Sequence, residues 1–254
     1  MRTVVVTGGS AGIGRAIAER FRQDGDEVVI TGRRAELLER VAAEIGARPV
    51  VCDASDPAKV ESMVAGLPER IDVLVNNAGG NADLAASSKA GSSQTGPDEG
   101  ETETGLARLA AAWQANFAAN VLSAVLTTAA LADRLADGGS VVLLGSIAAD
   151  RGSGGGSYGA VKVALSTWNL DLSAELGPRG ITSNVVSPGF IDDTEFFQGR
   201  MTDERRRRLV EQTRNGRTGH PADIAAAVHF LASAGARHIT GQVLNVNGGA
   251  WTTR

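Results

Sequence analysis

Hydrophobic residues follow two different spacings along this chain, and the two alternate from its first residues to its last. Short unbroken runs of β-branched and other apolar residues are typical of strands that are buried on both faces of a parallel sheet. These runs cover residues 2–7, 27–31, 48–52, 71–75, 140–144, 180–186 and 242–246. The pattern therefore predicts seven buried strands.

Between these runs the apolar residues recur at helical spacing, as Ile13, Ile17 and Phe21 do. The predicted helices cover residues 12–23, 34–45, 57–67, 106–135, 157–176 and 221–234, and another begins at about Thr202. Asp56 followed by Pro57 is typical of a helix start. Strands that alternate with helices predict an α/β chain, 1–254, with one doubly wound, mainly parallel sheet and helices on both faces.

Composition narrows the class of protein. The 254 residues are 43% hydrophobic and 21% charged, with a formal net charge of −4, which excludes a disordered chain and argues against a nucleic-acid binder. The single cysteine, Cys52, excludes an internal disulfide and a cysteine-based zinc site, and we expect no metal. No apolar run approaches the roughly 20 residues of a membrane span, and the amino terminus is too short for a signal peptide. We therefore expect a cytoplasmic protein without a membrane partner.

One segment interrupts the alternation. Residues 80–105 are rich in glycine, serine, alanine and threonine and show no periodicity. An extended loop of this length inside a compact domain is either functional or a surface insertion, and the sequence leaves both open.

A glycine-rich turn joins the first strand to the first helix. Gly8, Gly12 and Gly14 allow a tight turn and a close approach of the backbone to a phosphate, which the N–H groups of the helix would bind. A purely structural turn is the alternative. After the second strand, where an NAD enzyme would place a carboxylate, stand Arg33 and Arg34. Guanidinium groups bind phosphate, so the two arginines indicate NADP(H), which carries a 2′-phosphate, rather than NAD(H). The alternative is that both arginines are only solvated.

Tyr158 and Lys162 stand four residues apart on a predicted helix and so share one face. Tyr158 is the only tyrosine, and an ammonium group beside it is expected to lower the pKa of its phenol. Such a pair could exchange a proton with an alcohol or a carbonyl oxygen. Ser146, just beyond a predicted strand, could hold that oxygen.

Taken together, these motifs are similar to those of the short-chain dehydrogenase/reductase family in its compact single-domain form. The matching stretches are residues 7–14, 52–53, 76–79, 120, 146, 158–162 and 188–189, in this order. The resemblance covers essentially the whole chain. It implies a Rossmann-like fold and an oxidoreductase that transfers a hydride between NAD(P) and a substrate.

The resemblance also implies a role for each matching residue. Asn120, rather than Asn116, would hold a proton-relay water, Ser146 would polarise the carbonyl, Tyr158 would be the acid, and Lys162 would bind the nicotinamide ribose. Asp53 would contact the adenine. The cofactor-binding set implied by the family is Gly8, Ser10, Gly12, Ile13, Gly14, Arg33, Arg34, Asp53, Ala54, Asn77, Ala78, Gly79, Tyr158, Lys162, Pro188, Gly189, Ile191 and Thr194.

The chain departs from the family pattern in three places. The interval from Ser146 to Tyr158 is one residue shorter than usual, that from Pro188 to Thr194 is one residue longer, and the segment 80–105 is enlarged. Residues 190–217 correspond to the substrate lid, and their phenylalanines suggest an apolar substrate. The four arginines at 205–208 are either a solvated helix face or a docking site for an anionic substrate or acyl-carrier protein.

The expected activity is NADPH-dependent reduction of a ketone to a secondary alcohol, as in 3-oxoacyl thioester reductases and polyketide ketoreductases. The substrate could be carried on a carrier protein or on coenzyme A. The alternatives are an alcohol or sugar dehydrogenase that works oxidatively, and a non-catalytic dinucleotide sensor. Relatives commonly form homotetramers through the helices at 106–135 and 157–176, so a tetramer is expected, with a dimer as the alternative.

Overall fold

A single sheet of parallel strands forms the centre of the molecule. The computed structural model describes residues 1–84, 105–154, 156–197, 199 and 201–252. Within these residues the strand order is β3-β2-β1-β4-β5-β6-β7, and every neighbouring pair is parallel. The strands are β1 (Thr3–Thr7), β2 (Glu27–Gly32), β3 (Arg48–Val51), β4 (Ile71–Asn76), β5 (Leu135–Leu144), β6 (Thr182–Pro188) and β7 (Val243–Val246). The seven strands predicted from the sequence are confirmed.

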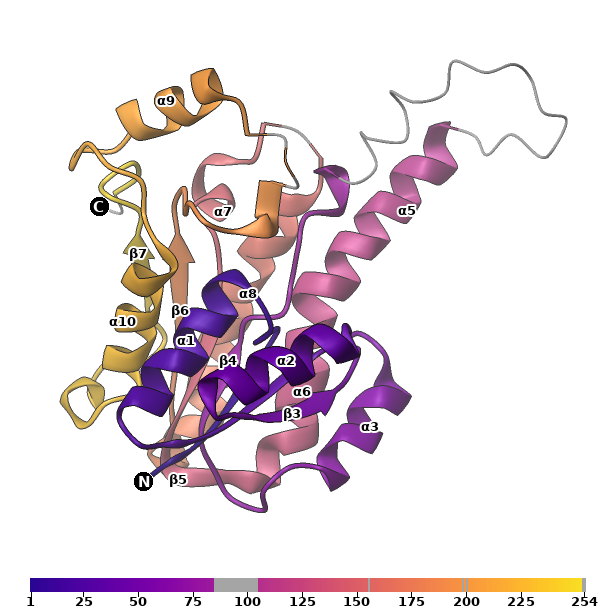
Figure 1. Cartoon of the computed structure of the whole chain (residues 1–254), viewed down its shortest axis with the longest axis vertical. Coiled ribbons are helices and arrows are strands. Elements are labelled where there is room, and N and C mark those ends of the chain that lie inside the picture. Colours follow the sequence, from indigo (N-terminus) through magenta and orange to yellow (C-terminus); the bar gives the residue numbers. More distant parts are fainter. Residues whose placement is uncertain (85–104, 155, 198, 200, 253–254) are drawn as a thin grey trace, which may run out of the picture.

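Helices cover both faces of this sheet (Figure 1). One face is covered by α1 (Gly12–Gln23), α2 (Ala35–Ile45) and α10 (Pro221–Leu231), and the other by α3 (Pro57–Ala65), α6 (Ser123–Leu131) and α8 (Tyr158–Leu176). Three further helices are α5 (Gly105–Phe117), α7 (Ala148–Arg151) and α9 (Asp203–Glu211). The doubly wound α/β architecture is therefore confirmed.

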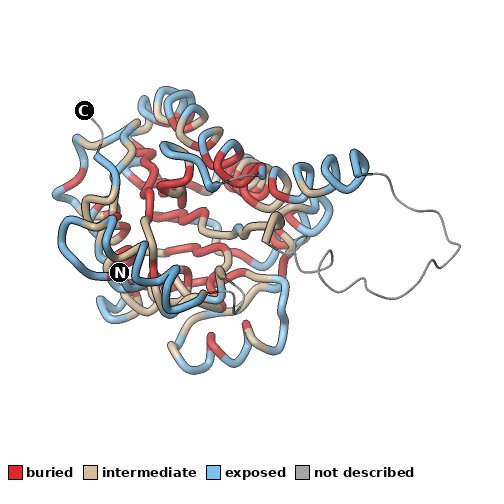
Figure 2. The backbone as a smooth tube through the Cα atoms, turned by 90° about the horizontal axis from the view of Figure 1, so that it is seen from above, coloured by how far each residue is buried: buried red, intermediate tan, exposed pale blue. Residues whose placement is uncertain are grey.

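The strands are apolar throughout because their side chains alternate between two cores. In β1, Val4 and Val6 pack with α1, α2 and α10, whereas Val5 packs with α3, α6 and α8. In β5, Val142 packs in the same core as Val4 and Val6, and Val141 packs in the same core as Val5. Figure 2 shows the result, with buried residues in the central strands and exposed residues on the outer sides of the helices.

The helix predicted over 106–135 differs from the prediction in two ways. A π-helical turn, Ala118–Leu122, separates α5 from α6, and Leu135 already belongs to β5. The buried side chain of Asn120 donates a hydrogen bond to the carbonyl of Asn116 at 2.9 Å within this turn. A side chain that bonds to a backbone carbonyl of its own helix competes with the regular ladder, which the apolar pattern alone does not reveal.

This same helix bears on the expectation that no segment is apolar enough to span a membrane, and it is weak evidence against it, because the core helix of a compact domain has the same length and composition. By length and composition residues 105–134 qualify, although 44% of the most apolar window is buried inside the protein. Its buried side is rich in small residues and packs on β4, α3 and α8. Of the extended loop predicted at 80–105, residues 85–104 lie outside the described residues.

Candidate active site

The carboxyl ends of β1, β2, β4, β5 and β6 surround one cavity of about 650 Å³. In an open parallel sheet this edge is where ligands bind. All of the predicted cofactor-binding residues line the cavity, from Gly8 to Thr194. Ser146, Tyr158 and Lys162 line it too, whereas Asn120 does not. The structure thus brings together side chains that are spread over most of the sequence.

The glycine-rich turn is closely packed and leaves the start of α1 open to the cavity. A Cβ atom on Gly14 would lie 2.2 Å from the carbonyl oxygen of Gly8, so a larger residue does not fit there. The N-cap residue of α1, Ala11, provides no side-chain hydrogen bond. The first N–H groups of α1 therefore have no side-chain cap, and with the positive end of the helix dipole they form a fitting site for a phosphate group.

This turn is bonded to the turn that follows β4. The hydroxyl oxygen of Thr7 accepts hydrogen bonds from the backbone N–H groups of Asn77 at 3.0 Å and Ala78 at 2.9 Å. The Asn77 side chain donates in return to the carbonyls of Thr7 at 2.9 Å and Gly8 at 3.1 Å. The two turns therefore form one rigid wall of the cavity.

The two arginines after β2 have different surroundings. The Arg33 guanidinium is 75% exposed, and its nearest carboxylate, Asp53, lies 3.8 Å away. Arg34 instead forms an ion pair of 2.9 Å with Glu195. Hydrogen bonds from Ser55 to the Asp53 carboxylate lower the pKa of Asp53. Arg33 is thus the more available of the two for an anionic ligand.

Tyr158, Ser146 and Lys162 meet at the other end of the cavity. Burial raises the pKa of Tyr158 to about 12, and a hydrogen bond with Ser146 lowers it in part. Burial lowers the pKa of Lys162 to about 8, and its Nζ donates a 2.7 Å hydrogen bond to the carbonyl of Leu144. The expected lowering of the Tyr158 pKa by the ammonium group was wrong, because burial raises the pKa and the group that lowers it in part is Ser146. Tyr158 is therefore protonated at neutral pH, as a proton donor must be.

Asn116 lies near the end of α5 and Asn120 in the π-helical turn that follows it, and the side chains of both form hydrogen bonds. Asn120 donates to the carbonyl of Gly80 at 2.8 Å and accepts from its N–H at 3.2 Å. Asn116 accepts from the N–H of Ala82 at 2.7 Å and donates to the hydroxyl of Ser157 at 2.8 Å. A Cβ on Gly79 would lie 2.6 Å from Asn120 Oδ1 and 3.5 Å from Lys162 Nζ. Asn120 is thus close to the lysine, although its side chain is turned to the segment after β4.

A short segment after β6 spans the cavity. Thr194 lies over Gly12, where an added Cβ would be 3.5 Å from the threonine methyl. The next residue, Glu195, forms the ion pair with Arg34, and the ring of Phe196 lies 5.3 Å from that of Tyr158. Consecutive residues therefore contact the glycine turn, the arginine after β2 and the tyrosine.

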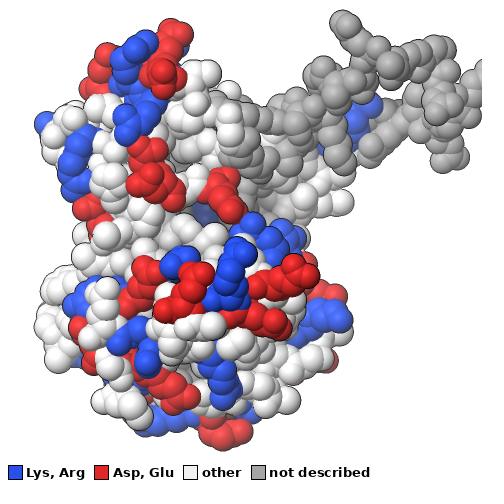
Figure 3. Space-filling view, in the orientation of Figure 1, with Lys and Arg blue, Asp and Glu red and all other residues white. Residues whose placement is uncertain are grey.

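The four arginines at 205–208 lie on α9 together with acidic residues. Arg206 pairs with Asp192, Arg208 pairs with Glu204, and the guanidinium of Arg205 lies 5.3 Å above the ring of Phe197. Figure 3 shows positive and negative side chains interleaved over this helix. Two of the four arginines of the basic run are therefore paired with carboxylates within the protein.

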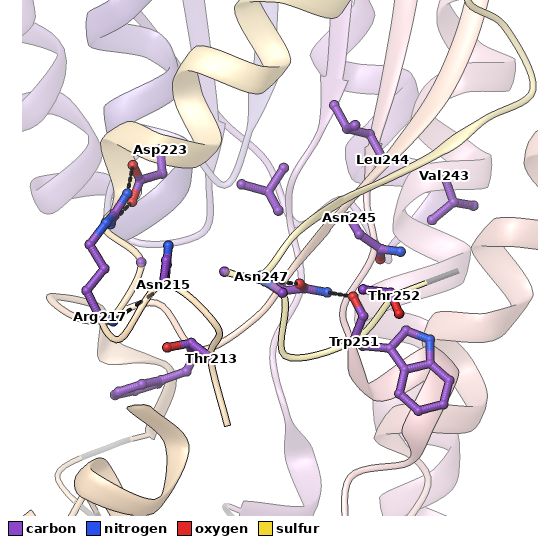
Figure 4. A pocket seen from close by; sticks show the side chains of 15 residues that line it. Thr213, Asn215, Arg217, Asp223, Val243, Leu244, Asn245, Asn247, Trp251 and Thr252 are labelled. Atoms are coloured by element: carbon purple, nitrogen blue, oxygen red, sulfur yellow. Dashed lines mark hydrogen bonds and ion pairs between the residues drawn. The ribbon is translucent and has the colours of Figure 1, made fainter. Parts of the chain in front are cut away.

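A second cavity, also of about 650 Å³, lies beside β7 (Figure 4). Arg217 faces Asp223 in a bidentate pair, with distances of 2.7 and 2.8 Å. Asn247 is bonded to the carbonyl of Trp251 at 3.0 Å. None of the predicted catalytic or cofactor-binding residues lines this cavity, although Phe190 and Arg217 of the predicted lid do, so the chemistry is assigned to the first one.

Sequence reasoning did not single out several residues of the first cavity. Glu195 was only part of the lid expected at 190–217, whose phenylalanines were related to an apolar substrate, and Asn81 was not considered. Asp83, which bonds to the start of α8, was also missed. No local pattern marks these residues, because their partners lie far away in the sequence. The charge of Glu195 opposite Arg34 is visible only once β2 and the segment after β6 are side by side.

The chain is similar to known proteins over nearly its whole length. A family model described as Enoyl-(Acyl carrier protein) reductase matches residues 8–251. The chain is 34% identical over 257 residues to the 3-oxoacyl-(acyl-carrier-protein) reductase FabG of Escherichia coli (strain K12), covering 98% of this chain and 97% of the relative.

Two solved structures share the fold over nearly the whole chain. One is a short-chain dehydrogenase/reductase, titled glucose/ribitol dehydrogenase, from Brucella melitensis, with a TM-score of 0.81, 31% identity and coverage of 99% and 97% of the two chains. The other is a blue fluorescent protein from a metagenomic library in complex with NADPH, also with a TM-score of 0.81 and 31% identity, covering 99% and 98%.

Proposed function

The chain belongs to the short-chain dehydrogenase/reductase family, and we propose on this basis that it reduces a ketone to a secondary alcohol with NADPH. It is an oxidoreductase of CH–OH and C=O groups. The observation that carries the proposal is the convergence of Ser146, Tyr158 and Lys162 on the cavity that also holds the glycine turn and Arg33.

The cavity fits a dinucleotide in both shape and chemistry. The open amino end of α1 and the close packing at Gly14 suit a pyrophosphate, and Arg33, with Arg34 beside it, suits a 2′-phosphate. One similar structure is titled as a complex with NADPH, which supports NADP(H) over NAD(H). When bound, NADPH supplies the hydride. Asp53, Ala54, Asn77, Gly79, Pro188, Gly189, Ile191 and Thr194 would form the remaining walls.

Each of the proposed catalytic residues would have a separate role in binding the substrate and in transferring the proton. Ser146 would hold the carbonyl oxygen of the substrate, and Tyr158 would donate its proton to that oxygen as negative charge develops. The phenol keeps its proton at neutral pH, as a donor must, but burial makes Tyr158 a weaker acid, and its hydrogen bond with Ser146 acts in the opposite direction. Lys162, which is positioned by its hydrogen bond to the carbonyl of Leu144, would hold the nicotinamide ribose. Asn120, which lies close to Lys162, would support a proton-relay water.

The substrate is proposed to be apolar near its ketone. Phe196 and Phe197 line the cavity from the segment that spans it, and Phe196 contacts Tyr158, whereas Phe190 packs against Phe197 and lines the second cavity. Residues 190–217 would act as the substrate lid. Because one relative is named a 3-oxoacyl-(acyl-carrier-protein) reductase, a 3-oxoacyl thioester or a polyketide-type ketone is the proposed substrate class. Oxidation of an alcohol or a sugar is the alternative, which the Brucella melitensis title supports.

We also propose self-association, as a homotetramer. Leu106, Leu109, Trp113 and Phe117 recur at helical spacing on α5 and are 45% to 78% exposed, and Leu170 on α8 is 57% exposed. An exposed apolar stripe of this length is typical of a surface that packs against another chain. A cytoplasmic location remains part of the proposal.

Loss of reduced-nicotinamide absorbance tests the proposal, with NADPH and NADH compared over a panel of ketones, sugars and 3-oxoacyl thioesters. We expect turnover with NADPH on an apolar ketone or a thioester. Faster turnover of alcohols or sugars with an oxidised cofactor would favour the dehydrogenase alternative. Tight NADPH binding without turnover of any carbonyl or alcohol would favour a dinucleotide sensor.

A further inference from the structure

The amino end of α8 is held by a carboxylate from far away in the sequence. Asp83 Oδ2 accepts hydrogen bonds from the backbone N–H groups of Ser157 at 2.9 Å and Tyr158 at 3.0 Å. Asp83 Oδ1 accepts a third, from the hydroxyl of Ser157 at 3.2 Å. The N-cap residue Ser157 makes no capping hydrogen bond of its own. Asp83 therefore supplies both the acceptors and the negative charge that a helix start requires.

A second contact fixes the position of Asp83. Asn116 accepts a 2.7 Å hydrogen bond from the N–H of Ala82 and donates one of 2.8 Å to the Ser157 hydroxyl. Asn116 and Ser157 are both fully buried. The segment that carries Asp83 and the start of α8 are thus joined through the same asparagine, in a closed network of hydrogen bonds.

The turn before α8 is shaped around this carboxylate. Gly156 has φ +74, and a Cβ atom there would lie 2.4 Å from the carboxyl carbon of Asp83. No side chain fits between the turn and the carboxylate. The glycine is required by the close approach of Asp83 as well as by its backbone conformation.

The same segment forms part of the cofactor cavity. Residues 77–81 line it, and only Ala82 separates them from Asp83, whereas Tyr158 and Lys162 line it from α8. We propose that Asp83 is a positioning residue for the reaction, which fixes the backbone of Tyr158 against the wall that holds the cofactor. This inference rests on the proposed function, but the contact itself can be measured without any turnover.

Tyr158 is the first residue of α8, so its ring direction depends on a helix end that would fray without a cap. Loss of a helix cap costs about 1 kcal/mol, which is small for the whole protein. A displacement of about 1 Å at a reacting group, in contrast, can cost about 100-fold in rate. Removal of Asp83 should therefore lower the rate far more than the stability.

The single tyrosine makes the contact directly measurable, because a protein labelled with ¹⁵N-tyrosine has one labelled amide, that of Tyr158. We expect this amide to exchange slowly with solvent in the wild type and about 10-fold faster or more in Asp83→Ala. Asp83→Asn keeps one acceptor oxygen and should be intermediate. Asp150→Asn is the matched control, because Asp150 is an exposed carboxylate on α7 eight residues before Tyr158.

The kinetic arm measures kcat, KM for the ketone and Kd for NADPH in the same proteins. We expect Asp83→Ala to lower kcat by about 10- to 100-fold with little change in the NADPH Kd, and Asp83→Asn to recover part of the loss. If Asp83→Ala does not fold, Asp83→Asn carries the test.

Unchanged amide exchange in both variants would overturn the contact. Faster exchange with an unchanged kcat would show a cap without a positioning role. If the wild type reduces no carbonyl, the proposed function fails, whereas the exchange measurement still decides whether Asp83 holds Tyr158.

Discussion

At the scale of single residues, burial decides the protonation states of the two central groups. Lys162 is 5% exposed and Tyr158 is 7% exposed. Desolvation disfavours the charged form of each, so the lysine pKa falls and the tyrosine pKa rises. The residue types were visible in the sequence, but the balance between burial and mutual attraction was not, because it depends on how the surrounding elements close over the pair.

The Lys162 shift predicts a pH dependence of stability. An unfolded lysine titrates near pH 10.4, whereas Lys162 in the folded protein titrates at about 8. Between these values the unfolded chain binds more protons, so the free energy of unfolding rises with pH, by no more than about 3 kcal/mol from this group.

Urea unfolding of the wild type and Lys162→Met between about pH 8 and pH 10 measures this contribution. Cys52 and Tyr158 have raised pKa values and oppose the rise at high pH, but they are present in both proteins and cancel in the difference. The wild type should gain stability relative to Lys162→Met as pH rises. Parallel curves would contradict the shift.

The two arginines after β2 should contribute unequally to the choice of cofactor. Arg33→Ala should raise the Kd for NADPH by about 10-fold or more and leave that for NADH unchanged, because a charge-assisted hydrogen bond to phosphate is lost. Arg34→Ala should have a smaller effect, since Arg34 is already paired with Glu195. Fluorescence titration of both cofactors measures this. Equal losses for NADPH and NADH would contradict a 2′-phosphate site at Arg33.

At the scale of secondary-structure elements, the hydrophobic pattern predicted the strands and the early helices well. The predicted range 12–23 coincides with α1, in which Ile17 and Phe21 are buried at the helical spacing on which the prediction rested. The π turn at Ala118–Leu122 could not be predicted, since it depends on Asn120 reaching Gly80 on another segment. The short helix α7 was missed as well, because four residues carry no periodic signal.

The turn from β1 to α1 gives a prediction at this scale. Gly14→Ala places a methyl group 2.2 Å from the carbonyl oxygen of Gly8, so the turn must open. We expect a loss of about 1–3 kcal/mol in stability and a weaker binding of NADPH. Gly177→Ala is the control, because nothing lies within 4 Å of its added Cβ. Thermal unfolding that is unchanged in Gly14→Ala would contradict the close packing of this turn.

At the scale of the whole molecule, the sheet places residues from both halves of the chain around one cavity. The glycine turn follows β1, whereas the segment with Phe196 follows β6. The order of motifs allowed most of the site to be predicted, because the glycine turn, Asn77, Ser146 and Pro188 stand at the carboxyl ends of strands and Tyr158 and Lys162 at the start of a helix that faces them. The contacts between motifs, such as Asp83 with Tyr158, depend on three-dimensional closure and could not be predicted.

The exposed apolar stripe on α5 and α8 predicts association. Leu109→Glu combined with Leu170→Glu should convert a tetramer into smaller species, because charges on both helices would be buried without partners. Light scattering after size-exclusion chromatography measures the mass. Val51→Glu, at an exposed position of the edge strand β3, is the control. A monomeric wild type would contradict the proposal.

The assignment of Tyr158 as the proton donor is the central claim, and Tyr158→Phe tests it most directly. The measurement is kcat for ketone reduction together with the Kd for NADPH in the same variant. We predict that kcat falls by about 100- to 10,000-fold while the Kd for NADPH changes little, because the proton donor is lost but the other cofactor-binding residues remain. Turnover by Tyr158→Phe at the wild-type rate would contradict the account.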